Sequence, residues 1–142
     1  MMIQDFQKRL RRAFSHAAFN YDALTTLHKT IGRELVRKVV AKDPCRRVLD
    51  VGCGTGYITK KMKFYFPDAE IFGLDLAEGM LAQAQRQLLE EDIRWVQADA
   101  AALPFGQEKF DIIISNLSYQ WVSNLSSAFV SCHRTLTKDG IF

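Results

Sequence analysis

Cysteine and histidine are scarce in this sequence. The three cysteines, Cys45, Cys53 and Cys132, are odd in number and include no close pair, which argues against a disulfide framework and against a zinc site. The three histidines, at positions 16, 28 and 133, also lie far apart. We therefore expect no metal centre.

Long apolar runs are missing as well. No stretch is long enough to cross a membrane, and the first residues, MMIQDFQKRLRRAF, carry charge without the apolar segment of a secretory signal. There is no internal repeat and no low-complexity segment. We expect a cytoplasmic location without membrane attachment. The 142 residues, 48% hydrophobic and 25% charged, are typical of one globular domain.

Charge is distributed unevenly along the chain. Residues 1–66 contain 14 Lys and Arg against 5 Asp and Glu, a net charge of +9, whereas residues 67–142 contain 5 against 11, a net charge of −6. A basic half can attract an acidic partner. A solvated surface explains the same pattern without any partner.

The first third of the chain has the apolar spacing of two helices. Apolar residues recur every three or four positions between residues 6 and 21, and again between residues 24 and 39. Asp43-Pro44 then breaks the pattern. We predict that residues 1–43 form two amphipathic helices and that residues 44–142 form the core of the domain.

From residue 47 onward, short apolar runs alternate with helical stretches. Strands are predicted at RVLDV, AEIFGLDL, IRWVQAD, FDIIISN and GIF. Helices are predicted at YITKKMKFYF, AEGMLAQAQRQLLEED and NLSSAFVSCHRTLTKDG, the last with Gly140 at the C′ position. This alternation predicts an α/β fold with a mostly parallel sheet, helices on both faces and right-handed crossovers.

The segment VLDVGCGTG, residues 48–56, places a glycine-rich turn directly after the first strand. A dinucleotide site has the spacing G-x-G-x-x-G and holds a pyrophosphate, but Gly52, Gly54 and Gly56 put the third glycine one residue early. The glycines alone leave the cofactor open. Asp50 would repel a pyrophosphate and attract a cation, which favours S-adenosylmethionine, because that cofactor carries an ammonium, a sulfonium and no phosphate. The glycines let the backbone approach its methionine part closely.

Polar residues stand at the ends of the other strands. Asp75 ends the second strand, Asp99 follows the third and Asn116 follows the fourth. Ligands of parallel sheets bind beyond the carboxyl ends of the strands. Asp75 suits the ribose hydroxyls, Asp99 suits the adenine amine, and the carbonyls of Asn116 would lie near the sulfonium or the amino group.

Their neighbours complete the predicted site. Leu76 and Met80 would pack on the adenine ring, and the backbone N–H of Ala100 would serve a ring nitrogen. Taken singly, each of these residues is also explained as a cap, a loop acid or core packing. Four polar groups at one sheet edge favour a site over four coincidences.

The motifs VLDVGCGTG, GLDLAEGML, VQADAAALPF and FDIIISN closely resemble those of class I S-adenosylmethionine-dependent methyltransferases, over about residues 47 to 142. The resemblance implies a Rossmann-like fold and cofactor roles for residues of the motifs, namely Asp50, Gly52, Cys53, Gly54, Asp75, Asp99 and Asn116. A complete domain of this class has seven strands, so we expect the sheet here to be incomplete around the fifth. Tyr21, with Phe14 and His16, would close over the cofactor, although Phe14 and Tyr21 also suit a helix core.

A narrower resemblance links SNLSYQWVSNL and RAFSHAAFNYD to the malonyl-acyl-carrier-protein O-methyltransferases of biotin synthesis. That family esterifies the free carboxyl of a malonyl thioester. A carboxylate is already a nucleophile, so positioning and exclusion of water suffice without a catalytic base. The resemblance implies that Tyr119, Gln120 and Trp121 line the acyl side, with packing as the alternative for Trp121. It also implies an acidic acyl carrier protein as partner, docked by basic residues of the first helix, namely Lys8, Arg9, Arg11 and Arg12.

Two other functions remain open at this stage. One is methylation of another small molecule or a protein, and the other is a non-catalytic module that binds S-adenosylmethionine or takes part in an assembly. Nucleic-acid methylation is disfavoured, because Asn116 is followed by Leu-Ser-Tyr rather than by Pro-Pro and an aromatic residue.

Overall fold

Five parallel strands form one sheet in the order β3-β2-β1-β4-β5. The computed structural model describes residues 2–24 and 26–142, with the side chains of residues 5–18 and 26–142. The strands are β1 (Arg47–Val51), β2 (Glu70–Asp75), β3 (Ile93–Gln97), β4 (Phe110–Ile114) and β5 (Leu136–Ile141). The helices are α1 (Met2–Leu24), α2 (Thr26–Val39), α3 (Tyr57–Tyr65), α4 (Glu78–Gln87) and α5 (Leu125–Thr135), with short 3₁₀ turns η1 (Ala100–Ala102) and η2 (Tyr119–Trp121). The predicted α/β fold with a parallel sheet and helices on both faces is confirmed.

Strand β1 lies at the centre of the sheet because its apolar side chains are buried on both faces. Val48 is paired with Ile71 of β2 and Ile112 of β4, and all three point to the same face. Leu49 and Val51 point to the opposite face. Alternation with a period of two thus supplies two cores, as expected for a parallel strand with helices on each side.

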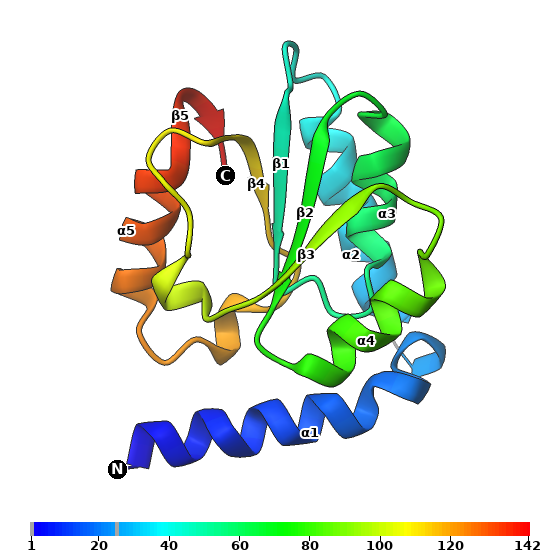
Figure 1. Cartoon of the computed structure of the whole chain (residues 1–142), viewed down its shortest axis with the longest axis vertical. Helices are drawn as coiled ribbons and strands as arrows, with labels where there is room; N and C mark the ends of the chain where they lie inside the picture. The colour runs from blue at the N-terminus through cyan, green and yellow to red at the C-terminus, as the bar shows by residue number, and fades with distance from the viewer. Residues whose placement is uncertain (1, 25) are drawn as a thin grey trace.

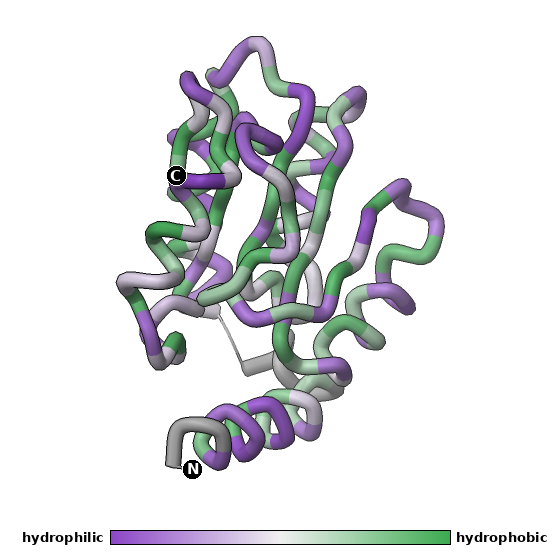
Figure 2. Tube along the Cα trace, turned by 60° about the vertical axis from the view of Figure 1, so that its left-hand side comes forward, coloured by the Kyte–Doolittle hydropathy of each residue, from purple (hydrophilic) through white to green (hydrophobic). Residues whose placement is uncertain are grey.

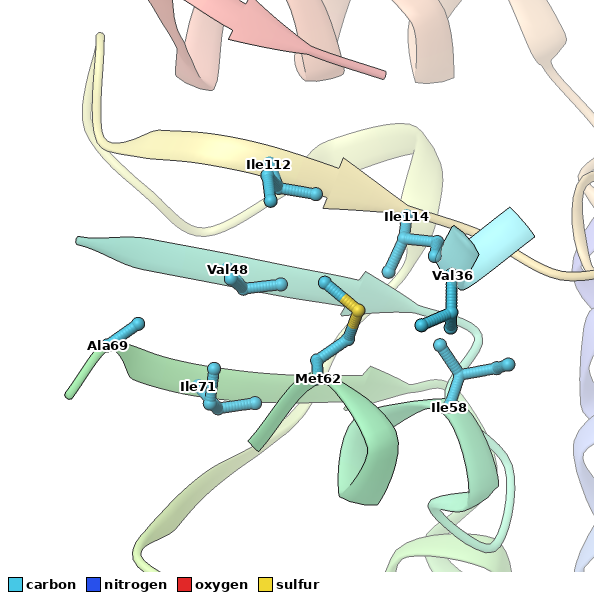
Figure 3. Packing of buried hydrophobic residues seen from close by; sticks show 8 residues of the cluster. All are labelled: Val36, Val48, Ile58, Met62, Ala69, Ile71, Ile112 and Ile114. Carbon is cyan, nitrogen blue, oxygen red and sulfur yellow. The ribbon is translucent and has the colours of Figure 1, made fainter. Parts of the chain in front are cut away.

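One core lies between the sheet and helices α2 and α3. Figure 3 shows Met62 and Ile58 of α3 and Val36 of α2 meeting valine and isoleucine side chains from β1, β2 and β4. The other core packs residues such as Phe72 and Phe110 against η1 and α5. The two cores fix the strand ends relative to one another.

Helix α1 runs along the end of the sheet where β2 leads into α4 (Figure 1). Hydrophilic and hydrophobic residues alternate along it, as Figure 2 shows. Ala18 is buried with Ala77 and Met80 of the α4 region, and the backbone N–H of Gly79 donates a hydrogen bond of 3.1 Å to Ser15 Oγ. These two contacts hold α1 over the carboxyl ends of the strands, where the sequence predicts the site.

Two predicted helix ends are wrong. Helix α5 ends at Thr135, and Gly140 lies inside β5 rather than at a helix C′ position. The carbonyls of Arg134 and Thr135 accept hydrogen bonds from the backbone N–H groups of Glu108 and Lys109, so the chain leaves the helix early to pair with β4. Helix α4 likewise ends at Gln87, because the chain turns there toward β3.

Candidate functional site

Two adjoining cavities lie at the carboxyl ends of the strands. They share three lining residues, Gly52, Gly54 and Asn116. The first cavity is also lined by Gln7, Leu10, Arg11, Phe14, Leu74, Asp75, Leu76, Ala77, Met80, Ala98, Asp99, Ala100, Leu117, Ser118, Trp121 and Val122. The second is also lined by His28, Lys29, Asp50, Cys53, Thr55, Tyr57 and Ile58. The glycine turn therefore separates two halves of one cleft.

The glycine turn bends sharply and is fastened to the segment after β4. Gly52, Gly54 and Gly56 have φ values of +71°, +56° and +90°, a region that residues with a Cβ rarely adopt. A Cβ on Gly52 would lie 2.3 Å from Ser118 Oγ. The hydroxyls of Ser115 and Ser118 both donate to the carbonyl of Val51, at 2.8 and 3.0 Å. The turn is thus held rigidly against the loop that carries Asn116.

Asp50 is a buried carboxyl, 1% exposed, at the end of β1. Its Oδ2 accepts a hydrogen bond of 2.7 Å from the hydroxyl of Thr59, which is also buried. Burial raises the pKa of Asp50 to about 7, and the negative charge of Asp75 adds to this, while the Thr59 hydrogen bond lowers it. Because Asp50 lines the second cavity, a cation bound there would favour its ionised form.

Asp75 ends β2 and is held by backbone groups. Its Oδ2 accepts from the N–H of Gly54 at 2.9 Å and its Oδ1 accepts from the N–H of Ala77 at 2.8 Å. Burial raises the pKa of Asp75, and these backbone hydrogen bonds partly offset the rise. Each carboxylate oxygen retains a lone pair for a further donor in the first cavity.

Asp99 joins the sheet end to α1. Its Oδ1 caps η1 by accepting from the N–H of Ala101 at 2.9 Å, and its Oδ2 accepts from Nε2 of Gln7, also at 2.9 Å. Asp99 is thus both the cap of η1 and a lining residue of the first cavity. The partner on α1 lies 92 residues away in the chain.

Asn116 lines both cavities and carries an unpaired acceptor. Its Nδ2 donates to the carbonyl of His28 at 2.8 Å, while its Oδ1 is buried and has no hydrogen-bond partner. A buried unpaired oxygen is costly, so its position where the cavities join suits a ligand that donates a hydrogen bond. With the Asp50 carboxyl, this makes the second cavity a place for a cationic donor such as an amino group. The first cavity, with two carboxylates and apolar walls, suits a nucleoside.

The other predicted residues differ in where they lie. Leu76, Met80 and Ala100 line the first cavity, and Cys53, whose thiol pKa is raised by burial, lines the second. The side chain of Tyr21 lies outside the described residues.

The three residues predicted for the acyl side separate. Trp121 lines the first cavity and packs edge-on against Phe14, with ring centroids 5.8 Å apart. Tyr119 instead stacks on Phe129 and shares a hydrogen bond with Cys132 Sγ. Neither Tyr119 nor Gln120 is among the residues that line the two cavities.

Several residues of the cleft have no role in the sequence analysis. Thr59 holds Asp50, Ser118 fastens the glycine turn, and Gln7 reaches Asp99. Lys29 and Tyr57 line the second cavity, with the Lys29 ammonium 5.7 Å from the centre of the Tyr57 ring. A polar residue on the apolar side of α3 was the only signal available for Thr59, and no local pattern points to Gln7.

Neither a metal site nor a membrane span is found in the described part of the chain. Among the described side chains, those of residues 5–18 and 26–142, no group of three or more His, Cys, Asp or Glu could hold a metal ion. None of the described helices is both long and apolar enough to span a bilayer.

A Rossmann-like α/β sheet with a glycine turn after β1 and acids at the ends of β2 and β3 defines a nucleoside-binding domain. Comparison with known families identifies it further, because a family described as a methyltransferase domain matches residues 48–140. The chain belongs to this methyltransferase family. The family and fold imply S-adenosylmethionine as the cofactor, and the cationic-donor site and the nucleoside site fit its two ends.

Relatives of known name agree with this assignment. The chain is 34% identical over 135 residues to malonyl-[acyl-carrier protein] O-methyltransferase of Bacillus cytotoxicus, covering 93% of this chain and 47% of the relative. It is 35% identical over 139 residues to the enzyme of the same name from Geobacter sulfurreducens, covering 96% and 52%. The chain thus spans about half the length of these relatives.

A solved structure from Methanococcus maripaludis, assigned as an S-adenosylmethionine-dependent methyltransferase, has the same fold. It superposes with a TM-score of 0.77 at 22% identity, covering 89% of this chain and 60% of that one.

Proposed function

We propose that this chain is the cofactor-binding part of an S-adenosylmethionine-dependent methyltransferase that methylates the free carboxylate of a malonyl-acyl-carrier protein. The observation that carries the proposal is that a buried carboxyl, Asp50, and a buried oxygen without a hydrogen-bond partner, Asn116 Oδ1, belong to residues that line the second cavity, which adjoins the first. A phosphate cofactor would meet repulsion here. The acceptor is proposed from the names of the relatives and from the NLSYQW segment.

The first cavity would hold the adenosine part. Asp75 would accept from the ribose hydroxyls and Asp99 from the adenine amine, because an ionised carboxylate offers only acceptors. The N–H of Ala100 would serve a ring nitrogen. Leu76 and Met80 would flank the ring with apolar surface, which both present to the cavity.

The second cavity would hold the methionine part. The Asp50 carboxylate and Asn116 Oδ1 would face the amino group, and the turn formed by Gly52, Cys53 and Gly54 would bring backbone close to the chain of the cofactor. The sequence-based prediction that Tyr21 closes over the cofactor is part of this proposal. When bound, S-adenosylmethionine supplies a methyl group on a sulfonium, and its transfer to a carboxylate oxygen gives a methyl ester and a neutral thioether.

The residues of this chain contribute by positioning rather than by proton transfer. A malonyl carboxylate is ionised at neutral pH, so no side chain has to remove a proton, and we assign no catalytic base. Trp121 and Phe14 line the first cavity, pack edge to face and would help to exclude water from bound ligand. Of the three residues predicted for the acyl side, Trp121 lines the first cavity and would face the acyl group, whereas Tyr119 packs on Phe129.

The proposed partner is an acyl carrier protein, which is acidic. Lys8, Arg9, Arg11 and Arg12 of α1 are exposed. Arg11 also lines the first cavity, and its Nη2 lies 3.7 Å from Glu78 Oε2 at the start of α4. A carrier docked on these side chains would therefore sit beside the mouth of the cleft.

A second candidate is a non-catalytic module that binds S-adenosylmethionine within an assembly. Exposed apolar side chains favour it, because Phe129, Val130 and Phe142 are 50%, 68% and 54% exposed near α5 and β5. Methylation of another small molecule or of a protein would use the same cleft.

Calorimetric titration with S-adenosylmethionine tests the cofactor site. We expect saturable binding by the chain, loss of binding in Asp75→Ala, and unchanged binding in Asp68→Ala, which removes an exposed acid outside the cleft. Equal binding by both variants would contradict the site. Transfer of a labelled methyl group to malonyl-acyl-carrier protein, against a panel of other acceptors, then tests the reaction. Binding without transfer to any acceptor would favour the non-catalytic module.

A further inference from the structure

One face of α1 forms part of the wall of the first cavity, the one proposed to hold adenosine. Gln7, Leu10 and Phe14 recur at spacings of three and four residues and all line that cavity. The basic residues Lys8 and Arg12 lie between these positions and are exposed. The helix thus presents the carboxamide of Gln7 to the cavity beside the apolar side chains of Leu10 and Phe14, with Arg11 as the other polar residue of α1 in its lining.

The amide of Gln7 is bound at the place assigned to the adenine amine. Its Nε2 lies 2.9 Å from Asp99 Oδ2 and 3.2 Å from Ser123 Oγ. The other oxygen of Asp99 caps η1 through Ala101, so Oδ2 is the oxygen that reaches across the cavity. Gln7 therefore ties the end of β3 to the loop before α5.

A carboxamide and adenine present the same hydrogen-bonding edge. Each has a planar NH₂ donor beside an acceptor, which is the amide oxygen in glutamine and a ring nitrogen in adenine. Asp99 Oδ2, an acceptor only, binds either NH₂ group equally well in chemical terms. We propose that Gln7 competes with the adenine amine for Asp99 Oδ2, so that α1 regulates entry to the adenosine site; this rests on the proposed function.

The competition needs only a local change. Besides Gln7, other described residues of α1 hold the helix in place, through the Phe14–Trp121 ring pair, the Ser15–Gly79 hydrogen bond, the Arg11–Glu78 ion pair and the burial of Ala18. None of them involves Asp99. Rotation of the Gln7 side chain away from Asp99 can therefore free the acceptor while α1 stays in place and the apolar residues beside it remain against the ligand.

The variant Gln7→Met tests the proposal, because methionine keeps the length and helix propensity of glutamine and lacks its donor. The matched control is Gln107→Met, an exposed glutamine in the turn before β4. The probes are S-adenosylhomocysteine and S-inosylhomocysteine, which differ at the 6-position of the purine, where the second has an oxygen in place of the amine. Affinities are measured by calorimetry, and helix content by circular dichroism.

We expect Gln7→Met to bind S-adenosylhomocysteine between about twofold and tenfold more tightly than the unchanged chain, the net effect of one hydrogen bond. We expect no gain for S-inosylhomocysteine and no effect of Gln107→Met. Unchanged or weaker binding of S-adenosylhomocysteine by Gln7→Met would overturn the competition. An equal gain for both probes would also overturn it, because the amine would then play no part. Absence of binding by every form would instead reject the proposed function, and the competition with it.

Discussion

Replacement of Asp50 by asparagine tests whether the buried carboxyl makes the free energy of unfolding depend on pH. Asp50 is 1% exposed, and the hydroxyl of Thr59 is the donor at its Oδ2. Burial raises its pKa from 3.8 to about 7. The folded chain therefore keeps a proton that the unfolded chain releases near pH 4, and the free energy of unfolding falls as pH rises from 4 to 7.

The size of the effect follows from that difference in pKa. A difference of about three between the folded and unfolded states corresponds to about 4 kcal/mol once both are fully ionised. Between pH 4.5 and pH 8 the folded chain loses about 3 kcal/mol of this amount. Asparagine is neutral at every pH and keeps an acceptor for Thr59, so Asp50→Asn avoids the loss. Burying the amide in place of the carboxyl can also change the free energy of unfolding, but by the same amount at every pH. It therefore does not affect how the difference between the two chains varies with pH.

Urea unfolding, followed by circular dichroism at pH 4.5, 6 and 8, measures the free energy of unfolding by linear extrapolation. We expect the stability of Asp50→Asn relative to the unchanged chain to increase by about 3 kcal/mol from pH 4.5 to pH 8. Asp68→Asn, at an exposed acid, is the control for the same chemical substitution outside the site. A pH-independent difference for Asp50→Asn would refute the argument that burial holds the proton.

Three further predictions concern the site and its partner. Affinity for S-adenosylmethionine should fall about tenfold for each pH unit below 7, because Asp50 must lose its proton to face a cation; calorimetry across pH measures this, and a flat profile contradicts it. Gly52→Ala should lower the free energy of unfolding by about 2–4 kcal/mol through its positive φ and the contact with Ser118; Ser118→Gly should restore part of the loss in thermal unfolding, and no rescue would mean that the contact is relieved elsewhere. The double reversal Lys8→Glu and Arg12→Glu should weaken binding of an acyl carrier protein and flatten its dependence on salt; binding unaffected at low salt would move the docking surface away from α1.

The sheet and its polar edge could be predicted because both depend on local patterns. Alternating strands and helices determine a parallel sheet. Asp75 ends β2 and Asp99 comes two residues after β3, so both side chains must lie at the same edge. The positive φ values of the glycine turn follow from the same nine residues that predicted it.

Contacts between distant segments could not be predicted in this way. Gln7 and Asp99 meet only because α1 lies across the sheet, and the direction of Tyr119 depends on Phe129 and Cys132 of α5. Helix α5 ends at Thr135 for a similar reason. The sequence predicts a helix that continues to Gly140, but pairing with β4 draws the residues after Thr135 into strand β5. Local propensity yields to tertiary pairing at such places.

The close contact between Ser15 and Gly79 provides a point about which α1 can tilt. A Cβ on Gly79 would lie 2.6 Å from the carbonyl oxygen of Ser15 and 2.7 Å from its Cα, so the two backbones touch and define a pivot. Gln7 lies eight residues away, about 12 Å along the helix axis at 1.5 Å per residue. A tilt of about 10° about the pivot moves Gln7 by roughly 2 Å, enough to break its hydrogen bond to Asp99. A force applied by a bound partner to the basic side chains on this arm would therefore be transmitted to the adenine end of the cleft.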